Sequence, residues 1–357
     1  MVFSKEDTIK IKGIAIIIML IYHLFGLRYN FINYGVNFFF LNSENAIQIA
    51  QIGNVCVSMF AFLSAYGISR KLLSLKSIDE IAKNSFRQYG NLLKIFIPIF
   101  ITSLLLFSKW ISISGTYGDG FGKYIYMLLD FLGLSNLFGG AIFNPTWWYM
   151  TLAILIIFIT PLLNAIFDKI GLVMLPLIAL FPLFFETNFM IAQYSFVIAC
   201  GVCFAKKNYL EKLKEYHFNK RMFINKTVKF ILSITGIIGF SLLKQSLTIP
   251  IKTTYYAEQI LAILIIYFIY EFLTDIKIVS LILKFLGKHS ANIYFTHTFF
   301  IIWVTPVKDF LFQLKYAWLI LVVTLGICIL FSLLLEFLKK VILVLTKTIS
   351  GNKKLLS

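Results

Sequence analysis

The chain has 357 residues, of which 59% are hydrophobic and only 14% are charged, and its formal net charge is +17. A soluble domain carries about 25% charged residues. With 38 phenylalanines among its residues, a soluble fold would have too little polar surface to cover its apolar interior. The composition therefore excludes a soluble protein and predicts an all-α, polytopic membrane protein.

Stretches of about 20 mostly apolar residues predict about ten membrane-spanning helices. They cover residues 9–27, 48–69, 89–108, 146–167, 169–187, 189–205, 227–244, 256–274, 290–306 and 314–338. Between the third and the fourth lies the apolar stretch 122–138, which glycine and aspartate interrupt, so we expect an interfacial or re-entrant segment there. No polar stretch is long enough for a soluble domain, and the sequence predicts a single membrane domain over 1–357.

The basic residues are distributed unevenly between the two sides that these spans define. If the N-terminus is cytoplasmic, most of the 33 lysines and arginines fall on the inner side, with many of them in the segment 206–229. The positive-inside rule then predicts that both termini are cytoplasmic. The excess of basic residues on the inner side accounts for the positive net charge, because these residues would lie near anionic lipid headgroups. The net charge therefore does not require a nucleic-acid partner.

The first predicted span contains the stretch IKGIAIIIMLIYHLFG (11–26), in which Lys12 lies near the start and His23 near the far end. Eleven residues at about 100° per residue make close to three full turns, so both side chains lie on one helical face. An ionisable residue inside a span is energetically costly and indicates function. The structural alternative is that His23 forms a hydrogen bond to a neighbouring helix.

A second group of polar residues surrounds the predicted cytoplasmic ends of the second and third spans. Lys83 and Arg87 are four residues apart on one helical face, which suits a polyanionic ligand, and Lys94 follows further along. Ser64 and Tyr66 place hydroxyl groups near the same end of the second span. We expect these residues to form or support a binding site for an anion.

A third group lies in the ninth span, within LGKHSANIYFTHTFF (286–300). Ser290, Tyr294 and His297 share one helical face because their spacings are four and three residues. His297 and the histidine of the first span can flank a shared cavity.

Two further features lie at predicted outer ends of spans. In NPTWWYMTLAIL (144–155), Trp147 and Trp148 indicate an aromatic belt at the membrane surface, and the alternative is a platform for a sugar ring. Glu258 opens the eighth span and is the outer carboxylate best placed for a site, although solvation at the interface also explains it.

These motifs, in this order, resemble those of the acyltransferase 3 family of bacterial membrane acyltransferases. The matching segments are KIKGIAIIIMLIYH, MFAFLSAYGISRKL, FRQYGNLLKIFIP, NPTWWYMTLAIL and LGKHSANIYFTHTFF, and the resemblance extends over about residues 5–340. It implies an enzyme of the bacterial cytoplasmic membrane. Such an enzyme takes an acyl group, usually acetyl, from acyl-CoA on the cytoplasmic side and delivers it to a hydroxyl of a cell-surface or lipid-linked carbohydrate.

The resemblance also assigns roles to particular residues. His23 matches the family's essential histidine, and Lys12 stands where the family usually has arginine. Lys83 and Arg87 match the spacing of a second basic motif that normally consists of two arginines. The implied donor is acetyl-CoA or another acyl-CoA, with no metal. Some members of the family carry an extracellular domain that completes the transfer, so a separate extracytoplasmic transferase is a possible partner here.

The basic residues Lys12, Lys83, Arg87 and Lys94 are expected to bind the CoA phosphates. His23 is expected to act as a general base on the acceptor hydroxyl or to accept the acyl group itself. Ser290, Tyr294 or His297 would then orient it or stabilise the oxyanion. Two rival functions are a transporter or flippase of lipid-linked sugars and a polysaccharide polymerase, and binding of acyl-CoA discriminates between these and the acyltransferase.

Overall fold

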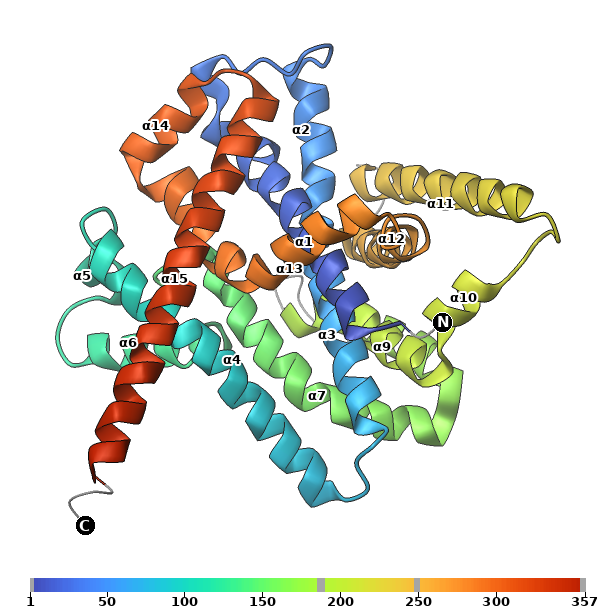
Figure 1. Ribbon diagram of the computed structural model, residues 1–357, viewed down its shortest axis with the longest axis horizontal. Coiled ribbons are helices and arrows are strands. Elements are labelled where there is room, and N and C mark those ends of the chain that lie inside the picture. Colours follow the sequence, from blue (N-terminus) through green and yellow to red (C-terminus); the bar gives the residue numbers. More distant parts are fainter. Residues whose placement is uncertain (1–2, 185–189, 247–250, 354–357) are drawn as a thin grey trace. The chain divides into compact units, whose positions relative to one another are not determined.

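The computed structural model describes residues 3–184, 190–246 and 251–353, and in these ranges it contains helices and no strand (Figure 1). The α-helices are α1 (Lys5–Ile21), α2 (Ser43–Gln51), α3 (Cys56–Leu72), α4 (Ile78–Phe107), α5 (Ile113–Tyr117), α6 (Gly122–Phe131), α7 (Trp148–Ile170), α8 (Met174–Leu180), α9 (Met190–Lys207), α10 (Tyr209–Glu215), α11 (Met222–Gln245), α12 (Ile251–Phe272), α13 (Lys277–Thr298), α14 (Thr305–Gln313) and α15 (Ala317–Lys353). Two π-helical segments, η1 (Tyr22–Gly26) and η9 (Phe299–Trp303), directly follow α1 and α13. The predicted all-α class is confirmed.

Within the described residues, seven helical stretches are long and apolar enough to cross a membrane. They are Lys5–Gly26, Ser43–Leu72, Ile78–Phe107, Pro145–Phe184, Met222–Gln245, Thr254–Phe272 and Ala317–Val341. The chain is therefore a multi-pass membrane protein. The predicted number of ten spans and the cytoplasmic position of both termini stay predictions.

The seven stretches differ from the ten predicted spans in three places. The predicted spans 146–167 and 169–187 fall in the single stretch Pro145–Phe184, and residues 185–189 lie outside the described part of the chain. The predicted spans 189–205 and 290–306 correspond to α9 and to the second half of α13 with η9. Neither is among the seven, and both helices carry lysines, at 206 and 207 in α9 and at 277, 284 and 288 in α13.

The described contacts divide the chain into two compact units. Unit 1 contains Met1–Arg28, Phe40–Tyr89 and Tyr149–Lys288, and unit 2 contains Tyr29–Phe39, Gly90–Trp148 and His289–Ser357. Helices α4 and α13 contribute residues to both units. His23 belongs to unit 1 and His297 to unit 2, so a cavity shared by the two histidines stays a prediction.

Helix α1 begins at a capping box. The Ser4 hydroxyl accepts a hydrogen bond from the Asp7 amide, and the Asp7 carboxylate accepts one from the Ser4 amide. These two bonds satisfy backbone donors that a helix start otherwise leaves unpaired. Further along unit 1, a Cβ on Gly13 would collide with the Leu283 carbonyl of α13. Glycine at this position therefore lets α1 and α13 approach through their backbones.

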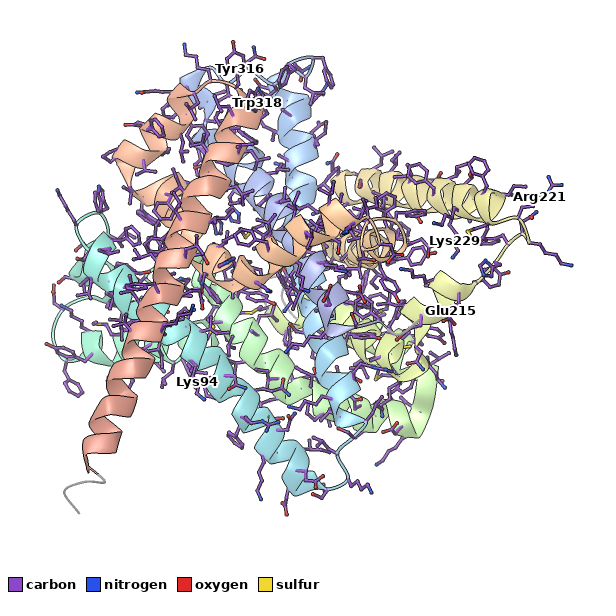
Figure 2. All side chains as sticks on the ribbon, viewed as in Figure 1. Lys94, Glu215, Arg221, Lys229, Tyr316 and Trp318 are labelled. Atoms are coloured by element: carbon purple, nitrogen blue, oxygen red, sulfur yellow. The ribbon has the colours of Figure 1, made fainter. Side chains whose placement is uncertain are left out.

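The basic segment 206–229 is largely helical, since it contains the end of α9, all of α10 and the start of α11. Arg221 lies at the outer end of the loop that joins α10 to α11 (Figure 2). By contrast, Lys229 is buried, and its Nζ lies 3.2 Å from the Glu271 carboxylate of α12 and 2.7 Å from the Lys214 carbonyl. The segment therefore combines exposed charge with one buried ion pair that joins α11 to α12.

Candidate functional site

His23 lies in η1, the widened turn that ends the first span. Its ring nitrogen Nδ1 lies 3.1 Å from the Met19 carbonyl oxygen, four residues earlier in the chain. Because a carbonyl only accepts hydrogen bonds, Nδ1 carries the hydrogen in this contact and the neutral ring has its lone pair on Nε2. The side chain is half-buried, and the backbone of its own helix orients the ring.

Glycines allow this turn to pack closely on the segment before α3. A Cβ on Gly53 would lie 2.5 Å from the Ile18 carbonyl oxygen and 2.9 Å from the Cβ of Tyr22, so any larger residue would displace the turn. The Gln51 side-chain amide donates to the Gly26 carbonyl at 3.3 Å. π-Helical turns occur frequently at functional sites, and here tertiary contacts support one that carries a histidine.

Lys12 and its neighbour Lys10 have different environments. The Lys10 ammonium lies 3.3 Å from Glu6 and donates to the Thr274 carbonyl at 3.3 Å, so it is neutralised within unit 1. Lys12 is half-buried and forms no hydrogen bond or ion pair with any residue that the structure describes. A cation held away from solvent without a counter-ion is a natural binding partner for an anion.

The three basic residues predicted on the third span lie in α4, with Lys83 and Arg87 in unit 1 and Lys94 in unit 2. All three side chains are exposed, and Lys94 is seen on α4 in Figure 2. Each is without a salt bridge to the described residues. They can therefore attract a phosphate group, but as solvated charges they contribute less binding energy than a buried one.

The two hydroxyls predicted beside this anion site are engaged within the protein. Tyr66 is buried and donates to the Glu211 carboxylate at 3.1 Å, and Ser64 forms a hydrogen bond with Tyr149. The Tyr66 hydroxyl is thus a structural partner of α10 rather than a free donor at the surface, which corrects the expectation. Glu211, which also accepts from the Phe3 amide at 3.3 Å, is a residue that the sequence analysis missed.

Glu258 is buried in unit 1, so solvation at the interface does not explain it. Its carboxylate lies 3.1 Å from the Lys244 ammonium of α11 and accepts hydrogen bonds from Asn54 at 3.2 Å and from Ser58 at 3.0 Å. These three donors satisfy the hydrogen-bonding capacity of the buried carboxylate within unit 1.

The NPTW segment forms a clamp on α13 within unit 2. Asn144 is fully buried, and its Oδ1 accepts from the Thr146 amide and hydroxyl and from the Thr298 hydroxyl at 2.6 Å. Trp147 Nε1 donates to the Phe295 carbonyl at 2.9 Å. Only 1% of Trp147 is exposed, so neither the aromatic belt nor the sugar platform applies to it. Trp148 is half-buried, and its predicted role stays open.

Ser290, Tyr294 and His297 all lie in α13, as the spacing predicts, and all three are buried. His297 Nδ1 lies 3.1 Å from the Ile293 carbonyl oxygen and 2.8 Å from that of Tyr294. The π-helical segment η9 begins two residues later, and its first residue, Phe299, stacks on Phe107 with a centroid distance of 4.2 Å. His297 therefore belongs to a tightly packed turn.

Comparison with known proteins gives one match. The family model described as Acyltransferase domain matches residues 10–336, which is nearly the whole chain. No curated protein and no solved structure matches the chain.

Proposed function

We propose, from the premise that this chain belongs to the Acyltransferase domain family and is a membrane acyltransferase, that it transfers acetyl from acetyl-CoA to a carbohydrate hydroxyl. The acceptor is a cell-surface or lipid-linked sugar, and the protein works in a bacterial cytoplasmic membrane with its donor on the cytoplasmic side. The proposal rests most directly on the His23 turn, where the Met19 carbonyl fixes the hydrogen on Nδ1.

This geometry suits proton transfer during attack on a thioester. The acceptor hydroxyl gives its proton to Nε2 as its oxygen forms a bond to the thioester carbon. The carbon–sulfur bond then breaks, and the CoA thiolate takes the proton from the imidazolium. In the covalent alternative, Nε2 attacks the thioester carbon and the carbon–sulfur bond breaks, which releases the CoA thiolate. The acceptor hydroxyl then takes the acyl group from Nε2, and its proton passes to the thiolate, so the ring returns to its neutral form.

Donor binding is assigned to the cations without internal partners. Lys12 supplies the half-buried charge for a CoA phosphate, with Lys83, Arg87 and Lys94 as exposed charges that raise the local concentration of the anion. Lys10 is excluded from this role because Glu6, Asp7 and the Thr274 carbonyl already occupy it.

Mass spectrometry of surface glycans tests the proposal. Cells that produce the protein should carry O-acetyl groups that are missing when the gene is absent or encodes His23→Ala. An equal acetyl content in all three strains, with the variant inserted normally, would refute it. Binding of acetyl-CoA by purified protein separates the proposal from a flippase or a polymerase, neither of which requires an acyl-CoA site.

A further inference from the structure

An apolar groove lies in unit 1 where α11 begins and α12 ends, and the proposed transfer chemistry does not use it. Its volume is about 520 Å³, within the roughly 300–1,000 Å³ that is typical of ligand sites. The side chains that line it are Met222, Phe223, Lys226, Thr227, Phe230 and Phe272. Met222 is 72% exposed and Phe223 is 82% exposed. Large apolar side chains thus surround an open space on the outer surface of this helix pair.

The groove lies at one end of two adjacent candidate spans, since α11 and α12 are both long and apolar enough to cross a membrane. The two helices are antiparallel, because Phe230 contacts Phe272 beside the groove and Lys244 pairs with Glu258 at the other end. The ends of spans lie where the hydrocarbon of a bilayer meets the headgroups. Lipid chains cover any apolar surface at this depth, so selectivity for one lipid has to come from polar groups beside the groove.

Three cations lie in the groove or directly precede it in the chain. Lys226 lines the groove, while Lys220 and Arg221 come immediately before Met222, with Arg221 at the outer end of the loop in Figure 2. All three side chains are exposed, and none forms an ion pair with a residue that the structure describes. By contrast, Lys229 is neutralised by a carboxylate of α12. Charge complementarity therefore favours an occupant that joins an anionic head to an apolar chain.

A second groove on the same helix has a similar size and a different charge. It lies between α2 and the far end of α11 and has a volume of about 450 Å³. The described residues that line it are aliphatic or neutral polar, such as Asn45 and Gln48, and none is charged. The nearby Lys244 is already paired with Glu258. The two grooves are about 22 Å apart along α11, so the second serves as an internal comparison for the effect of the cations.

We propose that the groove at the start of α11, here called the lipid groove, binds one anionic glycerophospholipid in preference to a zwitterionic one. The phosphate lies against Arg221 and Lys226, and one acyl chain lies along Phe230 and Phe272. Basic pockets between spanning helices hold anionic headgroups in this way, and each cation near the membrane surface raises the affinity about fivefold. The inference is independent of the proposed function, and it goes beyond general attraction to a membrane surface because it assigns a single site.

Native mass spectrometry of the protein in detergent tests this selectivity. The probes are phosphatidylglycerol, which carries a net negative charge, and phosphatidylcholine with the same acyl chains. We expect phosphatidylglycerol to bind at least tenfold more tightly. Arg221→Gln with Lys226→Gln should lower its affinity roughly 10- to 25-fold and leave that of phosphatidylcholine nearly unchanged.

A matched control separates the lipid groove from a general effect of charge. Lys71→Gln with Lys76→Gln removes the same charge from exposed lysines at and after the end of α3, and should change the affinity for phosphatidylglycerol less than twofold. Both double variants alter exposed side chains only, so both should unfold at the wild-type temperature. Equal binding of the two lipids by the wild type, or equal losses in the two variants, overturns the proposal.

Photo-cross-linking locates the bound lipid. Phosphatidylglycerol with a diazirine in one acyl chain should label the start of α11, and labelling of the second groove should be weaker. Thr227→Trp fills the lipid groove from an exposed position and should remove the stronger label. Equal labelling of both grooves contradicts the inference. A second copy of the chain is the alternative occupant, and a dimer that retains no lipid and dissociates on Phe223→Ser would also overturn it.

Discussion

The turns that carry His23 and His297 share a local geometry and differ in their surroundings. Each histidine lies in or just before a π-helical segment, and each Nδ1 lies 3.1 Å from the carbonyl oxygen four residues earlier. However, His297 is fully buried, whereas His23 is half-buried. The same backbone hydrogen bond thus occurs at a half-buried ring in one turn and at a fully buried ring in the other.

The neighbours of the two turns explain this difference. Around His297, Asn144 and Trp147 bind α13 on both sides, at Thr298 and at the Phe295 carbonyl. Around His23 the close contacts are made by Gly26 and Gly53, whose missing side chains let the backbone of the turn approach the segment before α3. We therefore assign chemistry to the first turn and packing to the second, and the following predictions test that division.

The largest expected effect separates the two histidines directly. His23→Ala should lower the rate of acetyl transfer roughly 10²–10⁴-fold, the usual contribution of a general base, and should leave thermal unfolding nearly unchanged. His297→Ala should instead lower the free energy of unfolding by about 2 kcal/mol, because it opens a cavity in a packed turn. Transfer rates and melting curves of the two purified variants measure this. The division is wrong if His297→Ala abolishes transfer in a fully folded protein.

The clamp should matter mainly for stability. Asn144→Ala leaves the buried hydroxyl of Thr298 without its acceptor and should cost about 3 kcal/mol of unfolding free energy. Trp147→Phe keeps an aromatic ring but loses the bond to the Phe295 carbonyl, and should cost about 1 kcal/mol. Trp148→Phe, at the adjacent half-buried position, is the control. Equal melting temperatures for all three variants would contradict the clamp.

The stability of the packing around the turn that carries His297 should also depend on pH. Asp130, outside the candidate spans, is buried and accepts from Tyr117 at 2.6 Å and from the amide of Phe143, a residue that packs on Phe299. Burial raises the pKa of Asp130 from 3.8 to about 7.

A raised pKa means that the folded state binds the proton more tightly than the unfolded state does. The free energy of unfolding is therefore highest, as far as Asp130 contributes to it, below about pH 4. It falls as the pH rises towards 7, by up to about 4 kcal/mol. Asp130→Asn should flatten this part of the stability curve, measured by thermal unfolding in detergent between pH 4 and 8. An unchanged curve would show that Asp130 does not titrate in this range.

A smaller effect should distinguish the two lysines of α1. Lys12→Ala should raise the KM for acetyl-CoA about tenfold and leave that for the acceptor unchanged, since one phosphate contact is lost. Lys10→Ala is the matched control, and it should alter stability more than donor KM because Glu6 and Asp7 lose their partner. Equal shifts of donor KM in both variants would refute the assignment.

The smallest effect is expected at the exposed end of α4. Lys83→Gln with Arg87→Gln should raise the donor KM about two- to threefold at low ionic strength, and the difference should disappear at high salt because exposed charges are screened. A salt-independent loss of more than tenfold would show that these residues bind the donor directly.

Much of the first turn could be predicted from the sequence. Lys12 and His23 belong to one continuous helix, so their spacing alone predicts a common face, and the unusual cost of a histidine in a span marks it. The π-helical geometry of η1 could not be predicted, because it depends on Gly53 and Gln51 from a segment about 30 residues away.

The second turn and the buried carboxylates show where local patterns fail. Trp147 follows a pattern typical of an aromatic belt, yet its partner is the Phe295 carbonyl, 148 residues further along the chain. Glu211 appears in a basic segment that suggests a solvated loop, and only the fold brings it to Tyr66. Such roles depend on which helices pack together, and helical periodicity does not specify that.

The most direct test of the account is to measure acetyl-CoA binding and CoA release in the same preparation of purified His23→Ala protein. We predict that the variant binds acetyl-CoA with the affinity of the wild type but releases CoA at least 100-fold more slowly, consistent with the loss of a general base or nucleophile. Release at the wild-type rate from the folded variant would contradict the central claim that His23 performs the transfer.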